Sequence, residues 1–369
     1  MQDCSIYVHW PFCRFKCPYC DFNSHVRDSV DQERFLNAYL KELHTYHHIL
    51  QSKRIKSIFF GGGTPSLAPP KTIGSIIEAI CKYPHDDDIE ITLEANPTSV
   101  ESKKFEEYAA AGINRISIGI QSFNTRNLKF LGRQHDVNEA KEAISIAAKI
   151  FDRYTFDLMY AMPNQTIKEW QQELTEALRF VRGHISLYQL TIEKGTAFYS
   201  DVLQGKFNMP RDALAADFYD MTQGIMEHAG MPAYEVSNHA SVGQASIHNM
   251  NYWEYGNYIG IGAGAHSRYS FEDQKIASVT WHQPEEWLSK IEATGNAIQK
   301  SESLSQEAQY QEKLIMRMRL AKGIPEPLIQ ITPAVSEIIA QGFLEKSECY
   351  IRIPKHHRLL TNSIIQKML

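Results

Sequence analysis

Three cysteines lie close together near the start of the chain, in the segment YVHWPFCRFKCPYCDFNS at residues 7–24. Cys13, Cys17 and Cys20 form a C-x₃-C-x₂-C pattern, and the other cysteines lie in separate runs. A disulfide framework spreads its cysteines along a small secreted chain, and structural zinc normally takes four ligands, with a second pair at a distance. Thiolates also ligate iron–sulfur clusters, usually four at a time. The triplet therefore predicts a [4Fe–4S] cluster with one open iron; the alternatives are incidental thiols or zinc.

A glycine-rich segment, FFGGGTPS at residues 59–66, follows the next apolar run. Its glycines, which include Gly62 and Gly63, allow a close approach of backbone to a ligand, and Thr64 offers a hydroxyl before a proline that fixes the turn. Such a loop by itself more often marks a plain tight turn. Its position, one strand–helix unit after the cysteines, favours a ligand-binding loop.

Four polar residues follow or end other apolar runs. Glu94 lies in LEANP, Gln121 in GIQSF, Arg133 in LGRQHD and Asp157 in FDLMYAMP. Each could be a solvated or capping group, which is the usual role of such residues. If the runs are neighbouring strands of one parallel sheet, their ends meet, and the four side chains converge on one mouth.

The elements that would position these residues alternate between strand and helix. Six runs predict strands, at residues 4–9, 55–60, 89–94, 115–120, 155–160 and 185–190, and helical periodicity lies between them, as in 31–50 and 137–150. This alternation predicts an α/β fold with a parallel sheet covered by helices. Six units are too few for a closed eight-stranded barrel, so we expect a partial (βα)₆ TIM-type barrel, with its chemistry at the C-terminal ends of the strands.

Beyond residue 200 the pattern changes. A helix is expected at about 210–229, then a glycine- and aromatic-rich stretch at 248–269 and a helix over 305–321. The last 60 or so residues contain a helix, then Gly342, then two short β-like runs around Tyr350–Ile353 and Leu359–Leu360, which resembles a winged-helix module. The basic residues at 352–358 favour a solvated face or a partner contact over DNA binding.

Composition narrows the classes of protein. The chain has 369 residues, is 43% hydrophobic and carries a net charge of −5, so no global field would draw it to nucleic acid or anionic lipid. No apolar run approaches the ~20 residues needed to cross a bilayer, and no secretory leader is evident. We therefore expect a cytoplasmic, soluble protein with no nucleic-acid partner.

The cysteine spacing resembles that of the radical S-adenosylmethionine superfamily. The resemblance implies that S-adenosylmethionine binds the open iron and can be cleaved to a 5′-deoxyadenosyl radical. It also implies a set of cofactor ligands on the motifs above: Tyr7, Tyr19, Gly62, Gly63, Thr64, Glu94, Gln121, Arg133 and Asp157. We expect residues 1–240 to form this core, 241–300 a connecting segment, and 301–369 the winged-helix-like module.

Several sequence segments, including YVHWPFC, GGGTPS, DLMYAMP and GIGAGAHS, together resemble those of the oxygen-independent coproporphyrinogen III dehydrogenase family. The dehydrogenases of that family carry a fourth cysteine where this chain has Phe22, and an extension ahead of the strand in which this chain already reaches Tyr7. Both departures point to the haem-chaperone branch, which is also marked by a His-Asn-x-x-Tyr-Trp motif, here HNMNYW at residues 248–253.

The motif makes His248 a candidate haem ligand. A lone histidine is more often structural, but an imidazole can ligate haem iron, and Tyr252 and Trp253 offer apolar faces to a porphyrin. Asn249 could fix the tautomer. The resemblance thus implies a protein that binds haem and delivers it to acceptor haemoproteins, including those of the respiratory chain, with an electron donor as a further partner.

The rival prediction is an enzyme, the dehydrogenase that removes two propionate carboxyl groups from coproporphyrinogen by radical chemistry. The cofactor site would serve it equally well, but Phe22 and HNMNYW weigh against it. We therefore expect no such activity, with cleavage of S-adenosylmethionine left open. A third alternative, a DNA-binding regulator that senses iron through the cluster, is supported by the terminal module alone.

Overall fold

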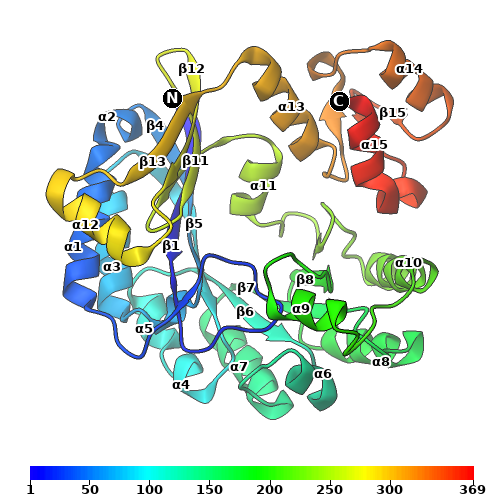
Figure 1. Ribbon diagram of the computed structural model, residues 1–369, viewed down its shortest axis with the longest axis horizontal. Helices are drawn as coiled ribbons and strands as arrows, with labels where there is room; N and C mark the ends of the chain where they lie inside the picture. Colours follow the sequence, from blue (N-terminus) through cyan, green and yellow to red (C-terminus); the bar gives the residue numbers. More distant parts are fainter.

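The computed structural model describes all residues, 1–369, and is built on one sheet of eleven strands (Figure 1). The strands lie in the order β13-β12-β11-β10-β1-β4-β5-β6-β7-β8-β9. Six consecutive strands of this sheet are parallel to one another: β1 (Gln2–Trp10), β4 (Lys53–Gly62), β5 (His85–Ala95), β6 (Arg115–Gln121), β7 (Arg153–Tyr160) and β8 (His184–Gln189). These are the six predicted strands, so the parallel α/β sheet is confirmed.

The six strands form an arc that does not close. The free edge of β8 pairs with the antiparallel strand β9 (Asn238–Ala240) and not with β1. The predicted partial barrel is therefore confirmed.

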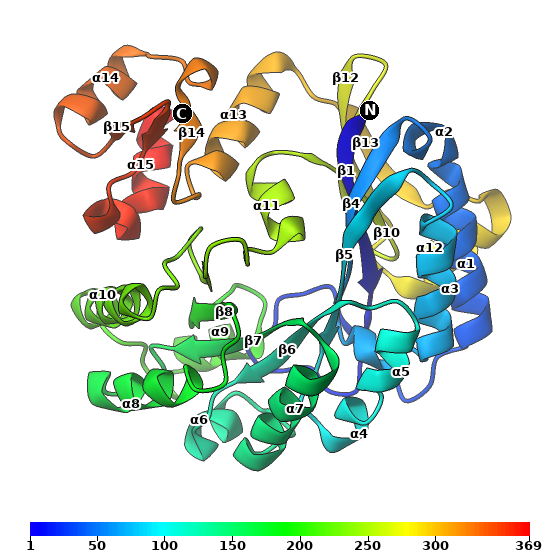
Figure 2. The ribbon, with the colours of Figure 1, turned by 180° about the vertical axis from the view of Figure 1, so that it is seen from behind.

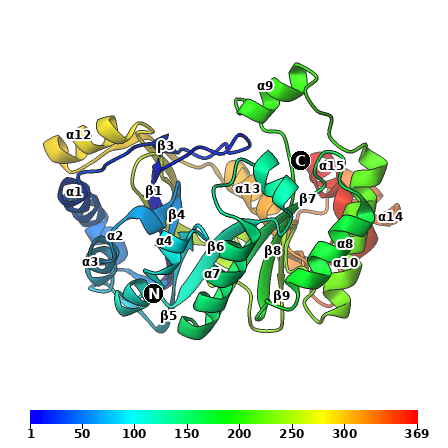
Figure 3. The ribbon, with the colours of Figure 1, turned by 90° about the horizontal axis from the view of Figure 1, so that it is seen from below.

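Helices cover the outer side of this arc (Figures 1 and 2). They are α1 (Gln32–Thr45), α2 (His47–Leu50), α3 (Pro70–Ile80), α4 (Ser99–Ser102), α5 (Phe105–Ala110), α6 (Thr125–Phe130), α7 (Val137–Ile150), α8 (Ile167–Ala177) and α10 (Asp212–His228). Local sequence explains where they begin: Asp136 with Glu139, and Thr166 with Glu169, form capping boxes at the starts of α7 and α8. Figure 3 shows α1 and α3 at one end of the sheet and α8 and α10 at the other.

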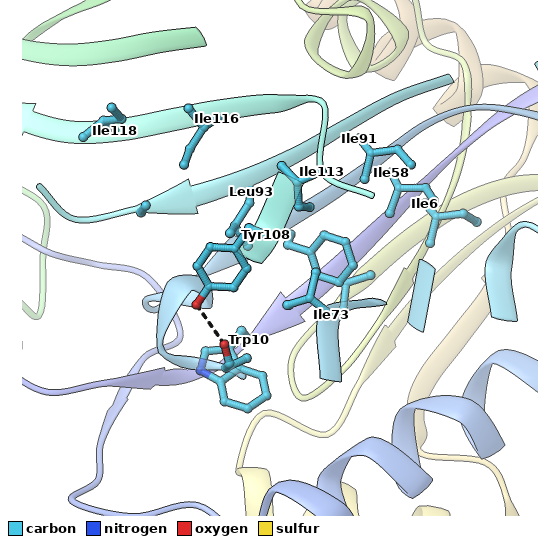
Figure 4. Close-up of a cluster of buried hydrophobic side chains, with 14 of the residues drawn as sticks. Ile6, Trp10, Ile58, Ile73, Ile91, Leu93, Tyr108, Ile113, Ile116 and Ile118 are labelled. Carbon is cyan, nitrogen blue, oxygen red and sulfur yellow. Dashed lines mark hydrogen bonds between the residues drawn. The ribbon is translucent and has the colours of Figure 1, made fainter. Parts of the chain in front are cut away.

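The main core lies between the sheet and these helices (Figure 4). The close-up shows buried side chains from successive strands and the helices behind them: Ile6, Trp10, Ile58, Ile73, Ile91, Leu93, Tyr108, Ile113, Ile116 and Ile118. Burying one such aliphatic side chain stabilises the fold by about 1.5–3 kcal/mol. Because side chains alternate along a strand, the residues between them face the barrel interior.

The segment 241–300 belongs to the main sheet. It supplies β10 (Asn257–Ile261), β11 (His266–Phe271), β12 (Gln274–Thr280) and β13 (Ile298–Ser303), with α12 (Pro284–Thr294) packed against α1. β10 pairs in parallel with β1, so the strand that leads to the cysteines has a neighbour on each side. This segment, expected to connect two domains, thus extends the barrel sheet.

One short helix, α11 (Ile247–Trp253), lies inside the arc, between β1 and the C-terminal module (Figures 1 and 2). It carries HNMNYW and contacts β1, β4 and β10 on their inner side. The predicted glycine- and aromatic-rich stretch therefore contains a helix and two strands.

The C-terminal module combines helices with short strands, but only one of the two expected β-like runs is a strand. Tyr350–Arg352 forms β16, whereas Leu359–Leu360 ends a 3₁₀ helix, η3 (Lys355–Leu360). The module contains α13 (Gln306–Arg317), α14 (Pro333–Ala340) and α15 (Thr361–Met368), with a three-stranded sheet of β14 (Ile324–Pro325), β16 (Tyr350–Arg352) and β15 (Glu345–Ser347). Its buried side chains, which include Leu314, Val335 and Ile351, form a core separate from that of the barrel.

Polar contacts join the module to the barrel. Glu312 on α13 accepts from Arg268 Nη2 over 3.0 Å and from Tyr255 Oη over 2.8 Å. Lys355, in the basic segment, forms an ion pair with Glu227 of α10. Part of that segment thus contacts the barrel itself. None of the helices combines the length and apolar composition that crossing a membrane requires.

Candidate functional site

The three cysteines of the triplet line a single cavity of about 550 Å³. Cys13 ends the short strand β2 (Phe12–Cys13), which pairs with β3 (His25–Val26), and the Cys20 amide donates to the Cys17 carbonyl oxygen over 3.1 Å. All three are free thiols; Cys13 is buried and the other two are half-buried. No fourth cysteine lines the cavity.

The chemistry of these thiols fits a metal cluster. Burial raises the pKa of the Cys13 and Cys20 thiols, so both are protonated at neutral pH in the metal-free protein. Because only a thiolate ligates metal, cluster insertion would release these protons. The three sulfurs are the donors that a [4Fe–4S] cluster with one open iron requires, and such a cluster would supply one-electron transfer.

The glycine-rich segment closes tightly over the cysteine loop. Gly62 has a φ of +112°, and a Cβ there would lie 2.6 Å from His9 Cε1. A Cβ on Gly63 would lie 2.6 Å from the Phe12 carbonyl oxygen and 3.0 Å from Cys13 Sγ. Only glycine fits at these two positions. Thr64 follows, buried, with its amide donating to the same Phe12 oxygen over 2.8 Å.

Two half-buried carboxyl groups line the cavity, Glu94 near the end of β5 and Asp157 in the second half of β7. Burial, together with the charge of Asp157, raises the pKa of Glu94 to about 8. Burial also raises the pKa of Asp157 to about 6. The Gly62 amide donates to Glu94 Oε2 over 3.3 Å. A cationic ligand would lower both pKa values, so this part of the cavity suits positive charge.

Arg133 brings a positive charge to the same cavity, from the loop that precedes α7. Its Nη2 donates to the Gly119 carbonyl oxygen over 2.6 Å and to Asn96 Oδ1 over 2.7 Å, while its Nε is buried without a partner. Gln121 also lines the cavity, with a φ of +71° that costs a non-glycine residue about 1–2 kcal/mol.

These groups fit S-adenosylmethionine by their charges. The cofactor carries an ammonium and a sulfonium, which match the two carboxyl groups, and a carboxylate, which matches the positive charge of Arg133. Glu94, Gln121, Arg133 and Asp157 would hold it beside the glycine loop. The cofactor itself would supply a cleavable carbon–sulfur bond.

The two predicted tyrosines lie in different places. Tyr19 lines the cavity and packs against Phe198, with ring centroids 6.3 Å apart. Tyr7 lies on the interior face of β1 outside the cavity lining, and its hydroxyl lies 3.1 Å from His9 Nδ1. His9 Nε2 lies 2.9 Å from the Asn23 carbonyl oxygen, so Nε2 carries the proton and Tyr7 donates to Nδ1.

Among the polar residues of the cavity that sequence reasoning missed, two lie next to predicted ligands. Asn96 accepts from Arg133 and donates through Nδ2 to Thr64 Oγ1 over 3.3 Å, so it links two predicted ligands. His135 is buried, and its Nε2 lies 3.0 Å from the Ile120 carbonyl oxygen. Both lie within two positions of a predicted ligand, in LEANP and LGRQHD, which was the available signal.

His248 lies on α11 in the barrel interior, outside the cavity lining, and is only 2% exposed. Its Nδ1 lies 2.9 Å from Ser57 Oγ, which itself donates to Ser5 Oγ over 2.8 Å. Nδ1 therefore carries the proton, and Nε2, which is buried without a partner, keeps an unshared lone pair. Burial lowers the pKa of His248 to about 3, so the ring is neutral.

Aromatic rings surround this imidazole. Phe59 stacks on it with ring centroids 4.8 Å apart, and Tyr252 meets it edge-on at 4.8 Å. We call this enclosed group, which consists of His248, Ser57, Phe59 and Tyr252, the histidine chamber. A neutral imidazole with a free lone pair is the form that ligates iron, but here it has no open face.

A buried carboxylate holds α11 in place. Glu90 on β5 accepts from the His248 amide over 3.0 Å and from Ser246 Oγ over 3.2 Å. Arg153 Nη1 donates to the same carboxylate over 2.8 Å, and Arg115 lies 3.9 Å away. Although burial opposes ionisation, the charges of Arg115 and Arg153 lower the pKa of Glu90.

The sequence of this chain is similar to those of known proteins. A family model described as the Radical SAM superfamily matches residues 7–177. The haem chaperone HemW of Escherichia coli is 35% identical over 99% of this chain and 98% of its own length. The mitochondrial radical S-adenosyl methionine domain-containing protein 1 of Danio rerio is 38% identical over 87% of this chain and 74% of its own length.

A solved structure shares the fold. Coproporphyrinogen III oxidase, HemN, from Escherichia coli, described as a radical SAM enzyme, superposes with a TM-score of 0.83 over 100% of this chain and 90% of its own. The two sequences are 19% identical, so this likeness concerns the fold.

Proposed function

Because this chain belongs to the family of radical SAM proteins that includes the haem chaperone HemW, we propose that it binds haem and transfers it to acceptor haemoproteins. Two relatives with that name, from Escherichia coli and Haemophilus influenzae, are 34–35% identical to this chain over 97–98% of their own length. The acceptors include haemoproteins of the respiratory chain, and an electron donor serves the cluster.

One observation carries the haem proposal: the unshared lone pair of His248 Nε2. Buried polar atoms are nearly always paired, and one left unpaired calls for an explanation. The hydrogen bond from Nδ1 to Ser57 fixes the tautomer in which Nε2 is the ligand atom. His248 would thus be the axial ligand of haem iron once the chamber opens.

The cofactor cavity supports a second part of the proposal. Cys13, Cys17 and Cys20 would hold a [4Fe–4S] cluster, and S-adenosylmethionine would bind its open iron against the glycine loop and the charged groups described above. In a chaperone this assembly serves as a platform that controls haem transfer, with or without cofactor cleavage.

The rival function, coproporphyrinogen dehydrogenase, would use the same cavity. Phe22, which stands where the dehydrogenase pattern has a fourth cysteine, is 58% exposed at the edge of the cavity. It ligates no metal and offers no acid or base. It therefore weighs against the dehydrogenase.

Two assays on one anaerobically reconstituted sample test the proposal. Haem titration should shift the Soret band, and incubation with coproporphyrinogen, reductant and S-adenosylmethionine should yield no protoporphyrinogen. Formation of protoporphyrinogen would overturn the chaperone as the primary function, and so would the absence of a Soret shift.

The ligand role of His248 needs its own control. His248→Ala should remove the imidazole signature from the haem spectrum. His239→Ala is the matched control, because His239 is also buried with an unpartnered ring nitrogen, Nδ1, but lies on β9. If both variants bind haem like the unaltered protein, His248 is not the ligand.

A further inference from the structure

Each of the three cysteine sulfurs lies beside a hydrogen-bond donor from a different segment. Thr64 Oγ1 donates to Cys13 Sγ over 3.5 Å, and Arg133 Nη1 donates to Cys17 Sγ over 3.5 Å. The Ser24 hydroxyl lies 4.0 Å from Cys20 Sγ. The glycine loop, the loop before α7 and the end of the cysteine loop thus supply one donor each.

Two of these donors are held in place by contacts that do not involve sulfur. Thr64 is buried; its amide donates to the Phe12 carbonyl oxygen, and its hydroxyl accepts from Asn96 Nδ2. Arg133 is held by Gly119 and Asn96 through Nη2, which leaves Nη1 for the sulfur. The donors therefore do not depend on a free thiol for their positions.

We propose that Thr64, Arg133 and Ser24 set the reduction potential of the cluster, with Arg133 as the dominant group. This inference rests on the proposed cluster. Reduction adds one electron, and much of the added charge resides on the sulfurs, so a donor hydrogen or a positive charge stabilises the reduced form. Such groups raise the reduction potential and make it easier for a donor protein to deliver the electron.

The three donors differ in predicted strength. Arg133 contributes both an N–H bond and a formal charge in a half-buried setting, where electrostatic interactions are stronger than in water. Thr64 contributes a neutral hydroxyl at the same distance, and Ser24 a hydroxyl at the longest distance. The effects should therefore decrease from Arg133 to Thr64 to Ser24.

Lys16 offers a matched charge control on the same loop. Its Nζ donates to the carbonyl oxygens of Phe22 and Ser24, each over 3.5 Å, and makes no hydrogen bond to sulfur. If the potential depended only on nearby positive charge, Lys16→Met would lower it much as Arg133→Met does. If bonds to sulfur matter, Lys16→Met should change it little.

The test is a redox titration of the reconstituted full-length protein with dithionite, followed by the EPR signal of the reduced cluster, without S-adenosylmethionine. The midpoint potential should become more negative in Arg133→Met, less so in Arg133→Lys and Thr64→Val, and least in Ser24→Ala. An unchanged or more positive potential in Arg133→Met, at full iron and sulfide content, overturns the inference.

Arg133→Met also removes the bonds to Asn96 and Gly119, so it could fail to assemble a cluster. In that case Thr64→Val, which keeps the shape of the side chain, is the deciding variant. The midpoint potential of its cluster must fall. Its Fe–S stretching frequency in the resonance Raman spectrum must rise, because a hydrogen bond to sulfur is lost. If neither changes, the inference is wrong. If the unaltered protein assembles no cluster, the proposed cofactor site itself fails, which is a separate outcome.

Discussion

The cofactor cavity and the histidine chamber share one barrel interior but differ in how ready they are for a ligand. The cavity lies at the C-terminal ends of the strands, with Cys17 and Cys20 half-buried beside about 550 Å³ of open space. The chamber encloses His248, of which 2% is exposed, beneath a helix held by Glu90. One site is open and the other is closed.

The difference teaches where conformational change is needed. The cavity groups can meet a cluster and cofactor where they stand. For the proposed ligation, iron would reach His248 Nε2 only if α11 moved away from Phe59 of β4 and the ring of Tyr252, which lies on α11 itself, turned aside. Haem binding should therefore be slower than cofactor binding, and its rate should depend on the contacts that hold α11.

The largest expected effect is the complete loss of one site's signal while the other site's signal is kept. Cys17→Ser should abolish the brown cluster chromophore after anaerobic reconstitution, because two thiolates cannot hold the cluster. The haem Soret shift should survive in the same variant. Cys349→Ser, at an exposed position in the C-terminal module, is the control and should keep the chromophore. Loss of both signals in Cys17→Ser would show that the two regions are not independent.

The next effect concerns the anchor of α11. Glu90→Gln removes the carboxylate that faces Arg115, Arg153 and the His248 amide, and leaves the buried Arg115 charge uncompensated. We expect the free energy of unfolding to fall by about 3–5 kcal/mol, measured by denaturant titration. Hydrogen exchange should locate the largest loss of protection in α11. A fall below about 1 kcal/mol would mean that Glu90 does not anchor the helix.

A smaller change should open the chamber without unfolding the barrel. Glu312→Gln weakens the bonds from Arg268 and Tyr255 that tie α13 to the segment after α11. A loss of about 1–2 kcal/mol should speed haem association by roughly 5–30-fold in stopped-flow measurements. Affinity for S-adenosylmethionine should not change. Equal effects on both ligands would contradict the separation of the two sites.

The last effect, a gradual one, is the pH dependence of ligand affinity in the cavity. Glu94 has a raised pKa of about 8 and Asp157 one of about 6; the Gly62 amide and Tyr7 also face Glu94, and Arg115 and Arg133 act on Asp157. Binding a cation favours the ionised carboxylates, so affinity for S-adenosylmethionine should rise between pH 6 and 8, by at most about tenfold per pH unit for each proton released. Isothermal titration calorimetry in two buffers would count those protons.

The stability of the protein without S-adenosylmethionine should show the opposite dependence on pH. Because the folded state keeps protons that the unfolded carboxyls release near pH 4.5, stability should fall as pH rises through the range up to about 8. Glu94→Gln should flatten both curves. A pH profile that Glu94→Gln leaves unchanged would assign the dependence to another group.

Sequence predicted the open site far better than the closed one. The six strands and the triplet depend on local patterns, namely apolar runs and short cysteine spacings. Once parallel strands are expected, their ends must meet, which accounts for the convergence of Glu94, Arg133 and Asp157. Tyr7 was harder to place, because its position on the strand, outside the cavity lining, depends on how His9 and Phe59 pack.

The extension β10–β13 lacked such a local signal. β11 and β12 join through Glu272 and Asp273, both with positive φ, a conformation that usually takes Asn-Gly or Asp-Gly in two-residue hairpins. The Glu-Asp pair at this turn therefore does not predict a hairpin from the sequence. The burial of His248 was equally hidden, because it depends on Glu90, 158 residues earlier in the chain.

The pairing of β1 with β10 has a consequence for the order of synthesis. Cys4 pairs with Asn257, and the Asn23 side chain of the cysteine loop donates to the carbonyl oxygens of Ala263 and His282. At about 5–20 residues per second, those partners leave the ribosome roughly 10–50 s after the loop itself. A nascent chain therefore presents its three cysteines long before their support is complete, so we expect stable insertion of iron and sulfide to follow translation of these partners.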